Sequence, residues 1–390
     1  MEEWKEYKIG EISTSNASQY SLSEKWTIVQ YLDTGNITNN VINEIQTIQI
    51  GKDELPSRAR RKVKPRDIVY STVRPNQKHF GFIDRPIDNM LVSTGFAVLS
   101  INEELADSKY VYYWLSQQGI VDYLHAIGEQ AVSAYPSIKA KDIEDLEILL
   151  PTLSIQRQIA SILSSLDDKI ELNKRINDNL EQQAQVIFNH YFTNEPYDCL
   201  LGEVVKTTSG GTPSRKIEDI YYNGSIPWVK SKELNGTFLF DTEEHVTELG
   251  ISNSSAKLLP KNSILIAMYG ATVGEYAIIS RSMCCNQAVC ALIPDDKMPY
   301  SYLFMIAKNR KNELINMAVG SAQQNISQVL VKNLPISSNY EIIAGFNNAT
   351  ISIFEKIKNN SSEIVKLILI RDSLLPKLMS GELKIKEMNN

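Results

Sequence analysis

A long helix without an internal break is the feature that most constrains this sequence. Residues 155–192 contain neither Gly nor Pro, and Ser154 stands before them as an N-cap. Apolar residues recur mostly three or four positions apart, at Ile159, Ile162, Leu163, Leu166, Ile170, Ile176, Leu180, Ile187 and Tyr191. This spacing predicts a helix of roughly 55 Å with a narrow apolar stripe, as in a coiled coil. Asn173, Asn177 and Gln183 interrupt the stripe, which needs a partner along its length.

A second stretch of the same kind closes the chain. Residues 338–380 carry a similar apolar stripe, Ser338 and Glu341 form a capping box, and Gly381 supplies a C-terminal stop. A shift of 184 positions places Ile159 on Ile343. The sequence therefore predicts two related long helices, each ending one half of the chain.

The stretches before the two helices also correspond. The matching pairs are residues 8–12 with 200–204, 57–65 with 252–260, 67–72 with 263–268, and 137–138 with 325–326. Apolar strand-like runs, Gly, Asn and Ser clusters, and short candidate helices at 108–118 and 120–126 predict a mixed α+β body in each half. We expect globular domains at residues 1–150 and 196–337, and long helices at residues 151–195 and 338–390.

Composition places the chain among soluble proteins of more than one domain. It has 390 residues, 43% of them hydrophobic, and no apolar run that reaches the ~18 residues of a membrane span. The charged start of the chain lacks a signal-peptide core, and the four Cys show no paired metal-ligand spacing, so we expect a cytoplasmic protein with reduced thiols. The net charge of −6 hides a strong asymmetry: residues 52–85 contain ten Lys and Arg against four Asp and Glu.

Several short motifs, in this order, resemble the specificity subunit of type I restriction–modification systems. They are residues 156–160 (QRQIA) with the helix after it, 209–214 (SGGTPS), 226–229 (IPWV), 269–274 (YGATVG), 286–288 (NQA), 323–326 (QQNI) and 375–381 (LPKLMSG). The resemblance covers nearly the whole chain and rests on the order of the motifs.

The resemblance implies a fold and a set of partners. Subunits of this family have two target-recognition domains, each of which reads half of a split double-stranded DNA site. Two antiparallel long helices between the domains carry two methyltransferase subunits, and a translocating endonuclease subunit can join. S-adenosylmethionine and ATP belong to those partners, so no cofactor is expected in this chain. Because the two halves differ in sequence, the two half-sites should differ as well.

In the first half, candidate DNA contacts form one dense basic cluster and one loop. The candidates are Arg58, Arg60, Arg61, Lys62 and Lys64, followed by Arg74, Gln77 and Lys78. Alternation puts Arg58, Arg60, Lys62 and Lys64 on one strand face, where they would pair with phosphates or guanine. The alternatives are a charged strand that protects a sheet edge and, for the loop, an ordinary polar turn.

In the second half the candidates are more scattered. They are Arg215, Lys216, Lys230, Lys232, Tyr269, Thr272, Gln323 and Gln324. For Tyr269 and Thr272, which rest on the family resemblance alone, the alternative is a tight turn at the end of a buried strand. Gly210 and Gly211 would let the backbone approach a phosphate, whereas we interpret Trp228 as a core anchor. Gln323 and Gln324 offer bidentate amides for adenine.

No catalytic constellation stands out. Asn194-Glu195-Pro196-Tyr197 has Glu where an adenine methyltransferase motif needs Pro, and Asp167-Asp168-Lys169 lies on the long helix. The four His are scattered without metal-ligand spacing. We therefore expect a non-catalytic DNA-recognition subunit, with a coiled-coil scaffold that binds proteins as the alternative.

Overall fold

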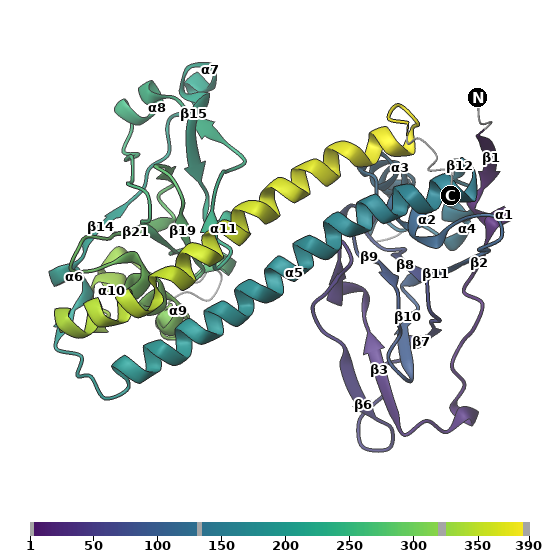
Figure 1. Cartoon of the computed structure of the whole chain (residues 1–390), viewed down its shortest axis with the longest axis horizontal. Helices are drawn as coiled ribbons and strands as arrows, with labels where there is room; N and C mark the ends of the chain where they lie inside the picture. Colours follow the sequence, from purple (N-terminus) through teal and green to yellow (C-terminus); the bar gives the residue numbers. More distant parts are fainter. Residues whose placement is uncertain (1–3, 131–134, 319–324, 385–390) are drawn as a thin grey trace. The chain divides into compact units, whose positions relative to one another are not determined.

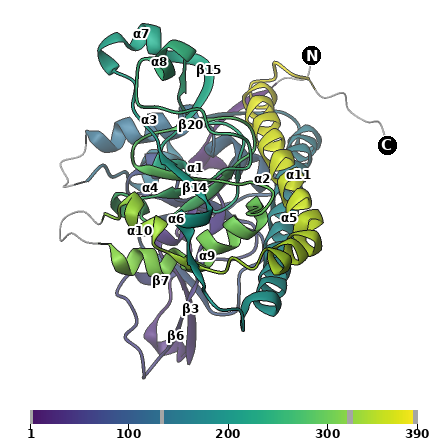
Figure 2. The same ribbon diagram turned by 90° about the vertical axis from the view of Figure 1, so that its left-hand side faces the viewer.

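The computed structural model describes residues 4–130, 135–318 and 325–384, which form two compact units (Figures 1 and 2). The first unit comprises Met1–Asp168 and Ile368–Asn390, and the second unit comprises Lys169–Leu367. The long helices α5 (Leu153–Phe192) and α11 (Tyr340–Met379) contribute to both units.

The first unit contains a succession of short strands and short helices. Its strands are β1 (Lys5–Lys8), β2 (Ser13–Ser15), β3 (Ile28–Leu32), β4 (Ile37–Thr38), β5 (Val41–Ile42), β6 (Gln46–Gln49), β7 (Ala59–Lys62), β8 (Asp67–Ser71), β9 (Phe80–Ile83), β10 (Met90–Ser93), β11 (Phe96–Ile101) and β12 (Glu147–Leu150). Its short helices are α1 (Ile9–Ile12), α2 (Ser108–Leu115), α3 (Gln118–Glu129) and α4 (Ala140–Glu144). The candidate helices at 108–118 and 120–126 correspond to α2 and α3.

Two sheets and a helical layer organise this unit. One sheet has the order β2-β11-β8-β9 and the other has the order β6-β3-β10-β7. Side chains of β8 alternate, so that Ile68 and Tyr70 pack toward α2, α3 and the start of α5, while Val69 packs between the two sheets. Figure 1 shows β3 and β6 reaching away from α5.

The second unit has the same kinds of element. Its strands are β13 (Cys199–Leu200), β14 (Lys206–Ser209), β15 (Tyr222–Val229), β16 (Phe238–Leu239), β17 (His245–Val246), β18 (Ile264–Ala267), β19 (Tyr276–Ile279), β20 (Cys284–Cys285), β21 (Val289–Ile293) and β22 (Pro335–Ile336). Its short helices are α6 (Leu201–Val204), α7 (Glu218–Tyr221), α8 (Glu248–Ser252), α9 (Tyr300–Met317) and α10 (Gln328–Lys332).

Its layers are arranged in the same way. One sheet has the order β14-β21-β18-β19-β16, and a smaller one has the order β17-β15-β20. In β18, Ile264 and Ile266 pack toward α9, α5 and α11, while Leu265 and Ala267 pack toward the smaller sheet. Figure 2 shows α9 beside the two long helices, against which its residues are buried.

Within the second unit, α5 and α11 run antiparallel with a polar layer between them. Asn173 Nδ2 donates to Glu363 Oε2 (2.8 Å), and Asn177 Nδ2 donates to Ser361 Oγ (3.1 Å). Asn360 Nδ2 donates to Asn177 Oδ1 (2.9 Å). We call Asn173, Asn177, Asn360, Ser361 and Glu363 the polar seam. Its amides have specific partners, so they do more than dilute an apolar stripe.

Three sequence-based details of the long helices are wrong. Ser154 lies inside α5, and Thr152 Oγ1 instead accepts from the N–H of Ile155 (3.5 Å). At the start of α11, the hydroxyl of Ser338 donates to Asp198 Oδ2 (2.9 Å), so no capping box forms with Glu341. Asn339 Oδ1 accepts the N–H of Ile342 (3.3 Å) and acts as the cap.

The third wrong detail concerns the stripe itself. Gln183 is exposed and bonded to Asn179, whereas the neighbouring Ala184 is fully buried. The C-terminal stop is confirmed, because α11 ends at Met379 and Gly381 adopts φ +72°.

Candidate nucleic-acid interface

The basic cluster of the first unit centres on β7, which is the last strand of its sheet. Arg60 and Lys62 lie in β7 and are half-buried, while Arg58 and Lys64 lie outside it and are exposed. The prediction that all four cations line one strand face is therefore wrong for Arg58 and Lys64, which lie outside β7. The strand is too short because the chain turns at both ends, with a register irregularity against β10 near Ser93.

Arg61 points the other way. It shares the inward side of β7 with the fully buried Ala59, and its Nε and Nη1 atoms are buried without a hydrogen-bond partner among the described residues. Burial lowers the pKa of Arg61 from its ordinary value. Because these two donors are buried on the inward side of β7, a phosphate outside the strand cannot reach them in this arrangement.

Lys62 is held in place by neighbours that the sequence did not single out. Its ammonium forms an ion pair with Glu24 and lies 5.1 Å from the ring centroid of Trp26. The hydrogen bond from Lys62 holds the pKa of Glu24 below its ordinary value. Trp26 in turn packs on Tyr20, with ring centroids 4.6 Å apart.

The outer edge of β7 is already paired. The N–H of Tyr20 donates to Arg60 O (2.7 Å), and the N–H of Lys62 donates to Ser18 O (3.1 Å). Residues 18–20 thus cover the strand, so its cations are not needed to block an open edge. This arrangement weakens the edge-protection alternative.

The loop after β8 carries the second group of candidates. Arg74 and Lys78 flank a single 3₁₀ turn (Pro75–Gln77), and both adopt left-handed backbone conformations with φ of 48° and 56°. Such strain in residues other than Gly is maintained only where the surroundings fix it. The Arg74 guanidinium lies 4.4 Å from the ring centroid of Tyr135, and Gln77 Oε1 lies 3.2 Å from His79 Nε2. The loop therefore holds its amide and guanidinium groups in fixed positions.

The glycine pair of the second unit has a packing role. A side chain on Gly210 would meet Cys285 O at 2.0 Å, and one on Gly211 would meet Ser255 Oγ at 2.3 Å. The Gly211 N–H already donates to Cys285 O (2.9 Å). The interpretation of these glycines as an approach to phosphate is therefore wrong. The Trp228 interpretation is confirmed, since its indole is 3% exposed and donates to Gly211 O (2.9 Å).

Most basic candidates of the second unit are paired with carboxylates. Arg215 forms ion pairs with Glu218 and Glu244, and Lys230 lies 2.7 Å from Glu244. Lys232 lies 2.7 Å from Glu243, while Lys216 is exposed. Sequence reasoning missed Glu218, Glu243 and Glu244, because nothing in a local pattern shows which cation a carboxylate meets.

The remaining candidates lie around the end of β18. Tyr269 is 39% exposed, and the hydroxyl of Thr272 donates to Tyr269 O (3.1 Å) within a tight turn at Gly270. Tyr269 also forms a β-bridge with Asn325. Gln323 and Gln324 lie outside the described residues. Tyr269 is thus presented to solvent, while Thr272 stabilises the turn.

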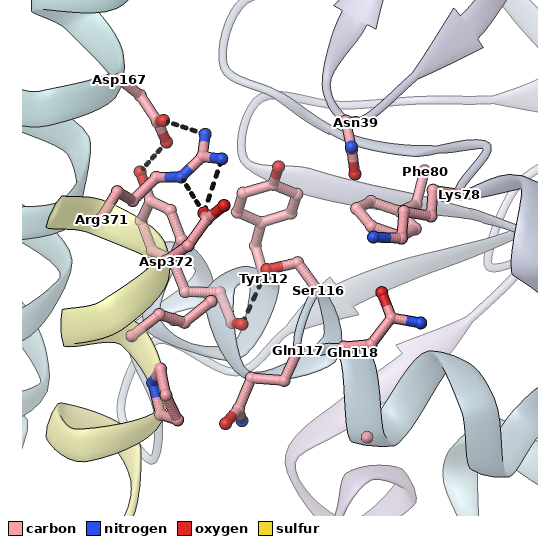
Figure 3. Close-up of a pocket in the computed structure, with 14 residues that line it drawn as sticks. Asn39, Lys78, Phe80, Tyr112, Ser116, Gln117, Gln118, Asp167, Arg371 and Asp372 are labelled. Atoms are coloured by element: carbon pink, nitrogen blue, oxygen red, sulfur yellow. Dashed lines mark hydrogen bonds and ion pairs between the residues drawn. The ribbon is translucent and has the colours of Figure 1, made fainter. Parts of the chain in front are cut away.

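A pocket of about 350 Å³ opens in the first unit between β9, α2 and the ends of the long helices (Figure 3). Figure 3 shows Arg371 lying between Asp167 and Asp372 on one side of the pocket. Asn39 and Lys78 lie on the opposite side of the pocket. The Arg371 guanidinium lies 2.8 Å from each carboxylate. The guanidinium is therefore fully engaged and fastens α5 to α11.

Other kinds of site find no support in the described part of the chain. No group of His, Cys, Asp and Glu there could hold a metal ion, and no helix there could cross a membrane. Burial raises the pKa of the Cys284 and Cys290 thiols to about 12, so both stay protonated and serve packing.

Comparisons with known proteins agree with this arrangement. A family model described as the type I restriction modification DNA specificity domain matches residues 1–182 and 198–338. The HindI specificity subunit of Haemophilus influenzae is 27% identical, over 98% of this chain and 100% of that protein. The MjaIX specificity subunit of Methanocaldococcus jannaschii is 24% identical, over 97% of this chain and 93% of that protein.

A solved structure shares the fold. The type I restriction–modification S subunit from M. genitalium superposes with a TM-score of 0.60 at 16% identity, over 100% of this chain and 97% of that chain. Because the family model matches most of the sequence in two separate segments, this chain belongs to the type I restriction–modification DNA specificity family.

Proposed function

We propose that this chain is the sequence-reading subunit of a type I restriction–modification complex, in which residues 1–150 and 196–337 each read one half of a bipartite, asymmetric DNA site. The observation that carries the proposal is the double match of the family model, at residues 1–182 and 198–338. Two copies of one DNA-specificity domain in a single chain suit a target with two half-sites.

Equivalent hydrogen bonds in the two units support a repeat with approximate two-fold symmetry. In the first unit the N–H of Ile138 donates to Thr72 O (2.8 Å), just beyond β8. In the second unit the N–H of Ile326 donates to Met268 O (2.9 Å), just beyond β18. The strand orders around β8 and β18 also correspond. Side chains near these bonds differ between the units, as different half-sites require.

The long helices, within residues 151–195 and 338–390, are proposed to form an antiparallel coiled coil that sets the gap between half-sites. They are also proposed to carry two methyltransferase subunits, which an endonuclease subunit can join. The polar seam and the Asp167–Arg371 ion pair support a fixed helix register.

The chemistry of the complex is assigned to the partner subunits. We propose that this chain has no catalytic activity, and that S-adenosylmethionine and ATP bind to the partners. The candidate contacts of this chain are suited to holding phosphates and base edges, through guanidinium, ammonium and amide groups.

An exchange of one domain tests the proposal. Residues 196–337 would be replaced by the equivalent domain of a relative, and methylated motifs would be sequenced in cells that carry all subunits. We expect one half-site to change while the other half-site and the gap stay the same. Altered bases in both half-sites would overturn independent reading. Methylation of an unchanged site would instead favour a scaffold that binds proteins.

A further inference from the structure

The second unit contains a neutralised group of cations at the place where its DNA contacts are proposed. Arg215, Lys230 and Lys232 are all engaged in ion pairs, and the carboxylates are Glu218, Glu243 and Glu244. Three cations face three carboxylates, so the group carries no net charge. Glu244 alone bridges Arg215 and Lys230.

The backbone fixes the position of the two neighbouring glutamates. The N–H of Trp228, in β15, donates to Glu244 O (2.9 Å), just before β17. The N–H of Glu243 donates to Glu233 Oε1 (2.8 Å). Hydrogen bonds from Lys232 and Lys230 hold the pKa of Glu243 below its ordinary value, and a hydrogen bond from Lys230 does the same for Glu244 despite some burial. Both side chains are therefore anionic at neutral pH.

Arg215 has a second support that does not depend on the glutamates. Its guanidinium lies 4.2 Å from the ring centroid of Tyr222 and 5.9 Å from that of Trp228. Stacking of this kind holds the guanidinium in place when a carboxylate is lost. Neutral glutamine at position 244 would thus leave Arg215 in place with Glu218 as its remaining carboxylate partner.

In the first unit, Lys62 is the one candidate cation of the described residues that pairs with a carboxylate, that of Glu24. Among the described residues, Arg58, Arg60, Lys64, Arg74 and Lys78 form no ion pair with a carboxylate. The first unit therefore has cations that are available to an anion, whereas the candidate cations of the second unit named above already have carboxylate partners. In the second unit a phosphate must compete with a carboxylate for each of Arg215, Lys230 and Lys232.

We propose that Glu243 and Glu244 are specificity-determining residues that compete with DNA phosphates for Arg215, Lys230 and Lys232 and so suppress binding to DNA that lacks the target. The inference rests on the proposed function, because it concerns how the second domain discriminates among DNA sequences.

The physical reason lies in the two kinds of DNA contact. Binding to non-target DNA depends almost entirely on phosphate pairing, whereas binding to the target adds base contacts. An internal carboxylate lowers the phosphate contribution for every sequence. In the target complex, base contacts offset the cost of replacing a carboxylate with a phosphate. The non-target complex has no base contacts that could offset this cost.

The test uses a complex assembled with its methyltransferase subunits and two labelled duplexes, one with the mapped target and one without it. With Glu243→Gln and Glu244→Gln together, we expect affinity for the non-target duplex to rise on the order of tenfold at low salt, because four partly exposed ion pairs, made by three cations, are lost. Affinity for that duplex should also fall more steeply with salt. Affinity for the target should rise less, so the ratio of the two falls.

A charge-matched control separates local from general electrostatics. Asp296→Asn with Glu341→Gln removes the same charge from exposed positions of the second unit outside this group. We expect this control to raise non-target affinity much less than the glutamate variant. An equal rise in both variants would overturn the inference.

A milder variant guards against a folding defect. The side chain of Glu243 is 57% exposed, and its replacement leaves the backbone bond to Glu233 intact. Glu243→Gln alone should unfold at the wild-type temperature and still raise non-target affinity. Unchanged affinity in this variant and in the double variant would refute the role of the glutamates while leaving the proposed function in place. A wild-type complex that binds both duplexes equally would instead refute both.

Discussion

A change in helix length gives the sharpest test of the proposed ruler. Adding four residues between Asp178 and Asn179 lengthens α5 by about 6 Å and turns the remainder of the helix by about 40° beyond a full turn. On the sequence alone, the polar breaks of the stripe predict that the seam absorbs this turn. The structure argues against that expectation, because the seam amides have specific partners.

The cost of a one-sided insertion can be worked out from the polar seam. Asn173 is 1% exposed and Asn360 is 3% exposed, and each donates to a partner on the other helix. The insertion shifts the seam relative to the packing of Phe188 on Phe346, so one of the two must lose its register. A buried amide left unpaired costs about 1–3 kcal/mol, so a shifted seam that loses both bonds costs about 2–6 kcal/mol. We expect the one-sided insertion to lower the unfolding temperature and to remove most of the methylation activity.

A matched insertion in α11 should restore the seam. Asn177 bonds to Asn360, and Phe188 packs on Phe346 with ring centroids 5.5 Å apart, so residues 358 and 359 lie opposite the first insertion. Four residues added there turn α11 in the same right-handed sense. The helices can then stay paired, with a seam that is about 6 Å longer and about 40° further turned.

The expected result is a longer DNA gap with unchanged half-sites. One base pair advances about 3.4 Å and turns about 35°, so the turn matches one added pair and the rise matches one or two. Sequencing of methylated motifs from cells with the matched variant measures the gap directly. A matched insertion of two residues serves as the control, since it turns the stripe by about 200° and should abolish activity.

Two outcomes would refute this reasoning. An active matched variant that keeps the original gap would show that the helices do not set the distance. A variant whose half-site bases change would show that the helices take part in reading.

Three further outcomes are expected. Arg58→Ala with Arg60→Ala should weaken DNA binding by the complex and reduce the salt slope of log K by about 1.8, since two phosphate contacts are lost; Arg61 stays unchanged because its partly buried side chain would confuse folding with binding. Unaltered affinity at low and moderate salt would mean that these cations do not touch DNA. Phe346→Ala should destabilise the protein by about 3–5 kcal/mol in urea unfolding, because Phe346 is fully buried against Phe188 and Phe192; a loss under about 1 kcal/mol would contradict the packing. The purified chain alone should transfer no methyl group from S-adenosylmethionine to target DNA, and incorporation of labelled methyl groups would contradict the assignment of chemistry to the partners.

The sequence predicted the long helices closely because nothing in them breaks a helix. The start of α5 was placed two residues late and the end correctly, since Leu153 and Phe192 bound an uninterrupted helical pattern. The buried stripe of α5 was predicted less well: Gln183 was placed in the stripe, whereas the neighbouring Ala184 is the buried residue. Periodicity identifies a face only approximately, and the neighbouring α9 and α11 decide which residues are buried.

The sequence predicted which residue types make up the candidate interface, but it did not predict which neighbours these residues contact. Clusters of Lys and Arg in residues 52–85 mark a basic surface on charge alone. The glycine pair at 210–211 was misread, because the need for close packing and the need for phosphate approach look the same in a sequence. Only the folded chain shows that Cys285 O occupies the space beside Gly210.

The sequence by itself determined the element types, the repeated order of strands and helices, and the basic density of the first half, because these depend on local propensity and periodicity. The tertiary structure decided which charges are available. Glu243 and Glu244 meet Arg215 and Lys230 across β15, over 13 to 29 positions of chain, and residues 18–20 reach the edge of β7 from 40 to 44 positions away. Electrostatic pairing depends on distance in space, and chain folding sets that distance without a local signal.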